Sequence, residues 1–387
     1  MLVTKTLGPD ETYDYSSMSA WQAGEQTDLV GDGDYHVLEC AAFTYLETVM
    51  VDIQGWGTDP DHDITIKPAA GAEHGGVWGE SLVLQRASSY NTVIIVTEVH
   101  ITIEGICIEQ INDAAAGHAA TFNGADIKVR NCLFRNYSPN GLGITVMNAV
   151  LENCRYEQMG TPYASAGLII PTWSGGGYRN CLCIGAFIGL EKPPNGSKNG
   201  ILENTVCIGS VDVDFKGLEN LTTTPPTNNA SSDDTAAGYA GSQTGVGEDD
   251  FVDYPNGNYE PAKGGKLAGT GVDLSEFFTD DITGYTRTIP WDIGPYAIQL
   301  GASISFIGPD VEDITLVPET PVPNPTPDPS MDERFSYSGG TVTYSLHEGT
   351  LPPGVTINPN TGNLVGTPTE NGTYPGIIVK GVLEREE

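Results

Sequence analysis

Apolar and charged residues alternate before a turn residue at five places between Ile101 and Val211. The five phrases are Ile103-Glu104-Gly105, Val129-Arg130-Asn131, Leu151-Glu152-Asn153, Tyr178-Arg179-Asn180 and Leu202-Glu203-Asn204. Because successive side chains of a strand point to opposite faces, we expect the apolar residue to point inward and the charge outward. Asn and Gly tolerate the left-handed backbone conformation, so each phrase predicts a strand that ends in a sharp bend.

The turn residues of these phrases are 26, 22, 27 and 24 positions apart. The strands of a β-sandwich would also be separated by regular turns, but they recur every 8 to 12 residues or so. A strand phrase that returns only after about 25 residues is typical of a solenoid. After the turn, two columns are expected to stack inward from coil to coil: Ile106, Cys132, Cys154, Cys181 and Thr205, and Ile108, Phe134, Tyr156, Cys183 and Cys207.

This Asn-cornered turn resembles that of right-handed parallel β-helices of the pectate-lyase type. The resemblance covers the turn and its flanks, and it carries over no catalytic residue. It implies an all-β fold whose main part, residues 61–299, is a right-handed parallel β-helix.

Residues 1–60 are expected to form an N-terminal cap and the first coils. Tyr13–Ala23 is a short amphipathic stretch that suits a capping helix, which an open β-helix end needs to cover its core. Strands are predicted at 35–40 and 48–53, and further coils at 82–85 and 93–96. The Tyr-Ser-x-x-Ser-Ala-Trp entry, with Ile64–Gly71 after it, resembles the opening of β-helical proteins encoded in tailed-bacteriophage genomes.

The repeat fades after Val213, and the polar run Thr222–Asp234 indicates a long loop. Further on, Asp281-x-x-Gly284-x-x-Arg287 and Asp292-Ile293-Gly294 resemble the closing segment of many β-helical surface proteins, with Pro295 and Ala297 as departures. We expect the solenoid to end near Ile298.

Residues 300–387 indicate a second module. Val311–Val317 is a candidate strand, and the Pro-rich stretch Pro318–Pro329 predicts a loop or an extended edge. Leu351–Asn358 and Thr361–Thr369 predict two short strands joined by Asn-Thr-Gly, with a hairpin turn at Asn371-Gly372. These stretches resemble the immunoglobulin-like domains of bacterial surface proteins and phage virion proteins, which implies a small immunoglobulin-like β-sandwich.

The net charge of the chain limits which classes of molecule it can bind. The net charge of −34 comes from 51 acidic and 17 basic residues, and such a surface repels nucleic acid and anionic membranes. It indicates a solvated acidic surface; calcium binding is the alternative, although no ligand loop has a recognisable spacing. No apolar run is long enough for a membrane helix. Met1–Pro9 lacks the pattern of a secretory signal, so we expect the chain to start in the cytoplasm or to be a mature form.

The seven Cys residues are expected to be buried thiols, because five of them fall in the inward columns. Disulfides between neighbouring coils are geometrically feasible but not implied. Cys181-x-Cys183 alone is weak evidence for zinc, since both side chains of such a strand pair point into the core.

Catalytic residues of a β-helix would lie on its outward face. Glu104, Arg130, Glu152, Arg179 and Glu203 alternate in sign, which predicts cross-strand pairing rather than catalysis. Asp59, Asp61, His62 and Asp63 flank Pro60 and indicate a turn. The loops 137–143, 160–176 and 191–200 are where recognition is expected; Tyr163 and Trp173 there could stack on sugars, though packing against the body is the plainer expectation. The sequence identifies no catalytic, cofactor-binding or metal-ligating residue.

Two classes of function remain open. The first is a non-catalytic bacteriophage virion surface protein, a capsid decoration, fibre or spike that is assembled in the host cytoplasm and contacts other virion proteins and a host surface glycan. The resemblance implies a homo-oligomer, with a trimer as the usual state. The alternative is a tailspike-type glycosidase or lyase that degrades host polysaccharide; a bacterial adhesin is a lesser possibility. An enzyme is expected to show a groove with two carboxylates about 5 to 10 Å apart.

Overall fold

The computed structural model describes residues 1–87, 92–112, 117–163, 166–170, 176–194, 198–298, 303–306, 315–316, 335–338, 341–367, 369–370, 372–373 and 377–384. The chain forms two compact units, Met1–Ile298 and Gln299–Glu387. Among the described residues, no helix is long and apolar enough to cross a membrane.

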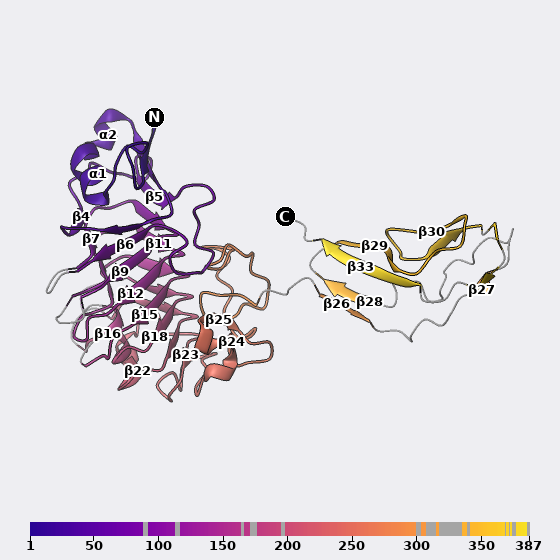
Figure 1. Cartoon of the computed structure of the whole chain (residues 1–387). Coiled ribbons are helices and arrows are strands. Elements are labelled where there is room, and N and C mark those ends of the chain that lie inside the picture. Colours follow the sequence, from indigo (N-terminus) through magenta and orange to yellow (C-terminus); the bar gives the residue numbers. More distant parts are fainter. Residues whose placement is uncertain are drawn as a thin grey trace. The chain divides into compact units, whose positions relative to one another are not determined.

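The first unit is a parallel β-helix (Figure 1). Its described strands form seven successive coils, each with one strand in each of three sheets, and every strand pairs in parallel with the equivalent strand of the next coil. The predicted all-β solenoid is therefore confirmed.

The strands of sheet 1 are β1 (Leu2–Leu7), β2 (Tyr35–Cys40), β5 (Ile64–Pro68), β8 (Ile101–Glu104), β11 (Ile127–Arg130), β14 (Val150–Glu152), β17 (Gly177–Arg179) and β20 (Ile201–Glu203). Those of sheet 2 are β3 (Thr44–Leu46), β6 (Val83–Arg86), β9 (Cys107–Gln110), β12 (Leu133–Asn136), β15 (Arg155–Gln158), β18 (Leu182–Ile184), β21 (Val206–Ile208) and β23 (Ala230–Ser231). Those of sheet 3 are β4 (Val51–Ile53), β7 (Ile94–Val96), β10 (Ala120–Phe122), β13 (Ile144–Val146), β16 (Ala166–Ile169), β19 (Ile188–Glu191) and β22 (Val213–Lys216).

The core includes the two predicted inward columns. Their members are buried, and all except the buried Thr205 belong to one continuous apolar cluster that runs through the coils. All seven Cys are free and buried, as expected, and Cys183 pairs in register with Cys207 on the neighbouring strand. Cys107 differs from the others because it points outward from sheet 2 into a second apolar cluster.

The predicted turn column is also confirmed. Gly105, Asn131, Asn153, Asn180 and Asn204 all have positive φ, between 49° and 65°. Asn228, with φ of 52°, continues the column 24 positions after Asn204 and was not recognised in the sequence, because the charge before it is missing. The run 222–234 is accordingly not all loop, since β23 adds a strand to sheet 2.

The N-terminal cap contains two short helices, α1 (Met18–Glu25) and α2 (Leu29–Asp32). Ser17 caps α1, and the buried Trp21 stacks on Trp56 with 5.4 Å between ring centroids. The capping helix expected at Tyr13–Ala23 is thus confirmed, with its start five residues later. Strand β1 precedes it and pairs with β2, which the sequence did not reveal.

Three smaller differences concern short strands. Of the strand expected at 48–53, only β4 is formed. The neighbouring strand β3 was not predicted. The loop expected at 160–176 contains β16. In each case three or four residues are too few for an alternation that stands out in the sequence.

The outer face of sheet 2 is covered by residues that follow the coils. Here lie η2 (Glu248–Asp250), β24 (Phe251–Asp253), η3 (Tyr254–Asn256) and β25 (Asn258–Pro261), after η1 (Leu218–Asn220). Apolar residues of this region, among them Phe251 and Ile293, pack on the outward side chains of sheet 2. Sheet 2 is therefore buried on both faces, which explains why its strands are apolar at consecutive positions.

Residues 267–298, here called the closing segment, run along the asparagine column. Asn228 Nδ2 donates to Thr270 O (2.7 Å), and Asn204 exchanges two hydrogen bonds with Val272, both 2.8 Å. The amide groups of Asn153 and Asn131 donate to Asp280 O (2.9 Å) and Asp280 Oδ2 (3.2 Å). The asparagines thus have a second role besides the turn: they hold the closing segment.

The acidic and basic residues of the closing phrase have structural partners. Asp281 Oδ1 accepts from Thr283 N (2.8 Å) and Tyr285 N (2.9 Å), and its Oδ2 accepts from Ala297 N (2.9 Å). Arg287 Nη2 donates to Gly294 O (2.8 Å). Burial lowers the pKa of Arg287 to about 10. These residues fold the closing segment onto itself and against the coils.

The second unit consists of antiparallel strand pairs. These are β26 (Ser303–Phe306) with β28 (Phe335–Ser338), β27 (Thr315–Leu316) with β32 (Gly372–Thr373), β29 (Thr341–Glu348) with β33 (Ile378–Glu384), and β30 (Val355–Ile357) with β31 (Leu364–Gly366). The hairpin predicted around Asn-Thr-Gly is confirmed by β30 and β31. Pro318–Pro329 and Asn371 lie outside the described residues.

Candidate functional site

The outward charges of the repeats stand in register on sheet 1. Glu104, Arg130, Glu152, Arg179 and Glu203 are cross-strand neighbours in that order. Arg130 pairs with Glu152 at 2.9 Å, and Arg179 pairs with Glu152 at 3.4 Å and with Glu203 at 2.9 Å. The predicted cross-strand pairing is therefore confirmed for these four residues.

Part of this charged column lies under the closing segment. Arg179 lies over the ring of Phe277, 3.5 Å from its centroid, and Arg130 Nη2 donates to Phe277 O at 2.9 Å. The side chain of Arg179 is 11% exposed and that of Glu152 is 8% exposed. Arg179 and Glu152 therefore pair within the coils and present little surface to a ligand.

Glu104 is the exception in the column. Among the residues that the structure describes, none forms an ion pair or a hydrogen bond with its carboxylate. Burial raises the pKa of Glu104, and the nearby charge of Asp280 raises it further, whereas Arg130 and Lys67 act in the opposite direction. The expectation of pairing is wrong for this residue, because Arg130 turns to Glu152 and Lys67 turns to Glu39 (3.4 Å).

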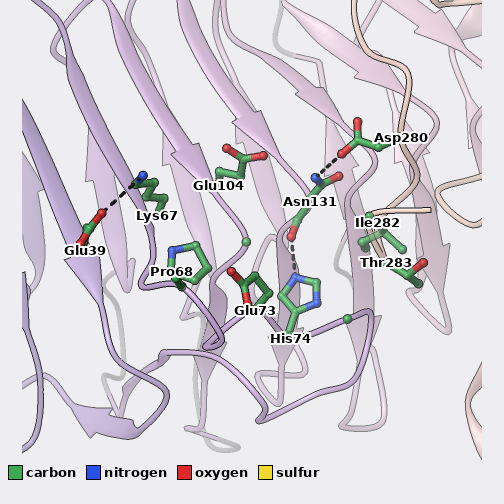
Figure 2. A pocket seen from close by; sticks show the side chains of 14 residues that line it. Glu39, Lys67, Pro68, Glu73, His74, Glu104, Asn131, Asp280, Ile282 and Thr283 are labelled. Atoms are coloured by element: carbon green, nitrogen blue, oxygen red, sulfur yellow. Dashed lines mark hydrogen bonds and ion pairs between the residues drawn. The ribbon is translucent and has the colours of Figure 1, made fainter. Parts of the chain in front are cut away.

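Glu104 lines a cleft of about 380 Å³ between sheet 1, the loop after β5 and the closing segment. Figure 2 shows Glu104, Glu73, Asn131 and Asp280 around this cleft. Other lining residues are Glu39, Lys67, Pro68, Ala70, His74, Gly75, Gly105, Ile282, Thr283 and Gly284. The cleft exists because the closing segment ends its contact with the asparagine column at Asn131, while Gly105 occupies the next turn.

His74 forms part of the cleft wall and is held as a neutral ring. Its Nδ1 accepts from Gly76 N at 2.8 Å, which leaves the proton on Nε2 for the bond to Asn131 O at 2.5 Å. Burial lowers the pKa of His74 to about 4. His74 therefore positions the loop after β5 against the turn of Asn131 and adds no positive charge to the cleft.

A second cavity, of about 320 Å³, lies on the same sheet. It is lined by Pro60, Asp63, His100, Thr102, Asp126 and Lys128. Thr102 and Glu104, which line the two cavities, lie two residues apart on the same face of β8, about 7 Å along the strand. Both cavities therefore lie on the outer face of sheet 1 between β5 and β11.

Other candidates from the sequence have structural roles or remain outside this surface. Asp59 and His62 close a turn, with 2.8 Å between Oδ1 and Nδ1, as predicted. Tyr163 is 77% exposed, so the expectation that it packs against the body is wrong. Trp173 lies outside the described residues. No group of three or more His, Cys, Asp or Glu side chains among the described residues could hold a metal ion.

Sequence reasoning missed three residues of the cleft: Glu73, His74 and Asp280. Glu73 and His74 lie in a loop without a repeat phrase. Asp280 directly precedes the closing phrase, and nothing in the sequence distinguishes it from the residues of that phrase. No local signal marks these residues, because their contacts span up to 149 positions of the chain.

The C-terminal residues 306–379 match a family model described as "Putative Ig domain". This unit is an immunoglobulin-like domain. The match covers the second unit and says nothing of the β-helix.

Several solved structures are similar to the chain, and three of them are described here. They are a pectate lyase, Pel9A (TM-score 0.42, 14% identity, covering 76% of this chain and 97% of that one), the deglycosylated pectin methylesterase of Aspergillus niger (0.36, 12%, 62% and 84%) and the pectin methylesterase of carrot (0.35, 10%, 74% and 97%). These likenesses are too weak to carry a functional argument. No curated protein matches the chain significantly.

Proposed function

We propose that this protein is a non-catalytic surface component of a tailed-bacteriophage virion, such as a capsid decoration, fibre or spike. The β-helix is its stiff body, and the immunoglobulin-like domain is its module for attachment or contact. The observation that carries the proposal is the state of the outward charges on sheet 1. Arg130, Glu152, Arg179 and Glu203 form ion pairs with one another, and Phe277 contacts both arginines, so these repeated charges serve rigidity.

The resemblances of the opening and closing phrases support the same proposal. A virion protein is assembled beside other virion proteins in the host cytoplasm, and it meets the host surface from outside. An acidic exterior suits a particle component that must stay dispersed until assembly. By the same resemblance we propose a homo-oligomer, with a trimer as the expected state.

A tailspike-type glycosidase or lyase is the second candidate, and the cleft favours it. Glu104 carries the raised pKa that a general acid needs, and the carboxylate of Asp280 lies near enough to contribute to it. A pair of carboxyl groups whose environments differ is the arrangement found in glycoside hydrolysis.

One experiment separates the two functions. The full chain is incubated with host surface polysaccharide, and the release of reducing ends or unsaturated sugars is followed. In parallel, the protein is added back to particles stripped of it. We expect binding to the particles and no sugar release. Release that is abolished in Glu104→Gln and retained in Glu11→Gln, an exposed residue outside the cleft, would establish the enzyme instead.

A further inference from the structure

Strand β1 is the outermost strand of sheet 1, at the N-terminal end of the β-helix (Figure 1). It pairs along one edge only, with β2. Leu7 O accepts a hydrogen bond from Ala41 N at 2.8 Å, so the odd-numbered residues of β1 direct their backbone groups toward β2. Because neighbouring residues of a strand bond on opposite sides, the backbone groups of Leu2, Thr4 and Thr6 point to the other edge.

Only the second half of this edge is blocked. Thr6 N donates to Asp14 Oδ2 at 2.8 Å, and Thr6 O accepts from Tyr15 N at 3.0 Å. Among the described residues, none is hydrogen-bonded to the corresponding backbone groups of Leu2 and Thr4. Both residues are exposed. The first half of the β1 edge therefore presents donors and acceptors to solvent.

The opposite end of the β-helix is treated differently. Sheet 3 ends there with β22, and its edge is blocked by side chains: Asp214 N donates to Asp233 Oδ2 and Phe215 N donates to Thr235 Oγ1, both at 3.0 Å. Blocking of this kind prevents a free edge from pairing with another chain. An edge that is left open is correspondingly suited to receive an extended segment as an added strand.

The side chains beside the open edge are apolar. Leu2 and Tyr35 are cross-strand neighbours on β1 and β2, and they are 47% and 39% exposed. A strand added to β1 would place its own side chains next to Leu2, and cross-strand apolar pairs stabilise a sheet. We therefore expect apolar residues at alternate positions of the added strand.

The charges around the edge are acidic. Asp10, Glu11 and Asp14 follow β1 and are exposed, and Asp34 directly precedes β2. The one basic side chain of β1, Lys5, pairs with Glu25 at 3.0 Å. Electrostatic complementarity therefore favours basic residues at the remaining positions of the added strand.

We propose that the edge of β1 from Leu2 to Lys5 pairs with an extended segment of another protein, whose side chains alternate between apolar and basic. The segment adds one strand to sheet 1 and fixes the β-helix by its N-terminal end. A second copy of this chain is a poor occupant, because it would bring the same acidic side chains together. The inference goes beyond the proposed function, since it names an attachment edge and holds for any partner with such a segment.

The test is calorimetric titration of the full chain at low salt with three end-blocked peptides. The first alternates valine and lysine, the second is the same peptide N-methylated at every backbone amide, and the third alternates valine and glutamate. We expect the first to bind at least about tenfold more tightly than the second, which has the same charge but cannot donate backbone hydrogen bonds. It should also bind at least about tenfold more tightly than the third, which is repelled.

Two variants locate the binding. Thr4→Pro removes an amide that faces away from β2, a position where an edge strand accepts proline, and it should weaken binding of the valine–lysine peptide about fivefold or more. Thr4→Val keeps the amide and should bind as the unmodified protein does. Circular dichroism and the unfolding midpoint check the fold of both. In the unmodified protein, hydrogen exchange should slow on binding in the segment that contains Thr4.

The other outcomes overturn the proposal. Equal binding of the N-methylated peptide would show that charge alone attracts it. Unchanged affinity in Thr4→Pro, or exchange slowed only elsewhere, would place the peptide on another surface, and no binding of any peptide would exclude the edge as a docking site. Sedimentation of the unmodified protein and Thr4→Pro examines the second copy: an oligomer that is lost in Thr4→Pro and kept in Thr4→Val would assign the edge to self-association instead.

Discussion

The guanidinium carbon of Arg179 lies 3.5 Å from the centre of the Phe277 ring. Arg179 belongs to the sixth coil, and Phe277 belongs to the closing segment that crosses the coils. A cation over an aromatic ring stabilises by about 0.5 to 2 kcal/mol, depending on how far the cation is desolvated. Here the arginine side chain is 11% exposed, so the contact should lie in the upper part of this range.

Phe277→Leu tests this contact. Leucine keeps apolar surface over Arg179 but has no ring face, so we expect the free energy of unfolding to fall by about 1 kcal/mol. The measurement is urea unfolding followed by circular dichroism. Val252→Ala, at another exposed apolar position, is the control and should change stability by less. An unchanged midpoint for Phe277→Leu would mean that the ring contributes nothing.

Asn153 allows the turn and the side-chain contacts to be measured separately. Its φ is 52°, and its amide donates to Asp280 O at 2.9 Å. Asn153→Gly keeps the left-handed turn and loses only the amide, which should cost about 1 to 2 kcal/mol. Asn153→Ala also has to place a Cβ in the left-handed region, and we expect it to cost about 1 kcal/mol more. Equal losses in the two variants would contradict a role for the backbone conformation.

His74 predicts a loss of stability in acid. Its pKa is lowered by burial to about 4 from an ordinary value of 6.5, so the unfolded chain takes up the proton first as the pH falls. Stability contributed by the neutral ring is complete above pH 6.5 and declines toward pH 4, by roughly 3 kcal/mol in total.

His74→Gln can keep both backbone hydrogen bonds and has no proton to gain, so its stability should depend less on pH between 6.5 and 4. The comparison is made by urea unfolding at several pH values. His62→Gln, in the turn with Asp59, should follow the unmodified protein. Parallel curves for His74→Gln and the unmodified protein would exclude His74 as the source.

The buried thiols predict a loss of stability in alkali. Burial raises the pKa of Cys107 to about 12 and those of Cys132, Cys154 and Cys207 well above the ordinary value of 9.0. The unfolded chain therefore loses these protons first. Each thiol stabilises the fold fully below pH 9, and its contribution falls by about 1.4 kcal/mol per pH unit above 9.

Cys132→Ala removes one of these thiols. It is expected to lower the free energy of unfolding at neutral pH, because it leaves a small cavity. Above pH 9, the free energy of unfolding should fall less steeply with pH than in the unmodified protein, because one ionisable thiol is missing. Unfolding curves at neutral pH and at several values above 9 give both quantities. A slope equal to that of the unmodified protein would show that Cys132 does not ionise on unfolding.

The β-helix could be predicted from the sequence because its structure repeats. Each coil places Asn or Gly at the same bend and an apolar side chain at the same depth, so a local phrase contains the register of the sheet. Asn153 and Cys154 could be placed from such a phrase alone. Strands of three residues between the phrases, such as β3, could not, because a single apolar pair has no measurable period.

The cleft could not be predicted in the same way. Glu104 looks like every other outward charge of the repeat, and only its partners distinguish it. Whether Arg130 turns to Glu104 or to Glu152 depends on Phe277, which accepts a hydrogen bond from Arg130 through its carbonyl group. Such a choice is made by residues far away in the sequence, and no phrase around Glu104 records it.

The closing segment changes how the β-helix can come apart. In a repeat protein, each coil touches only its neighbours, so the coils can fray one at a time from an end. Here the segment from Thr270 to Asp280 is bonded to the turns of three coils, at Asn131, Asn153 and Asn204, and to Asn228 after them. Tyr296 also forms hydrogen bonds with Arg155 and Gly76. Opening one of these coils therefore strains the contacts of the segment with the others, so we expect them to unfold together. Because the closing segment follows all the coils in the sequence, it is synthesised last, and these contacts can form only when every coil is present.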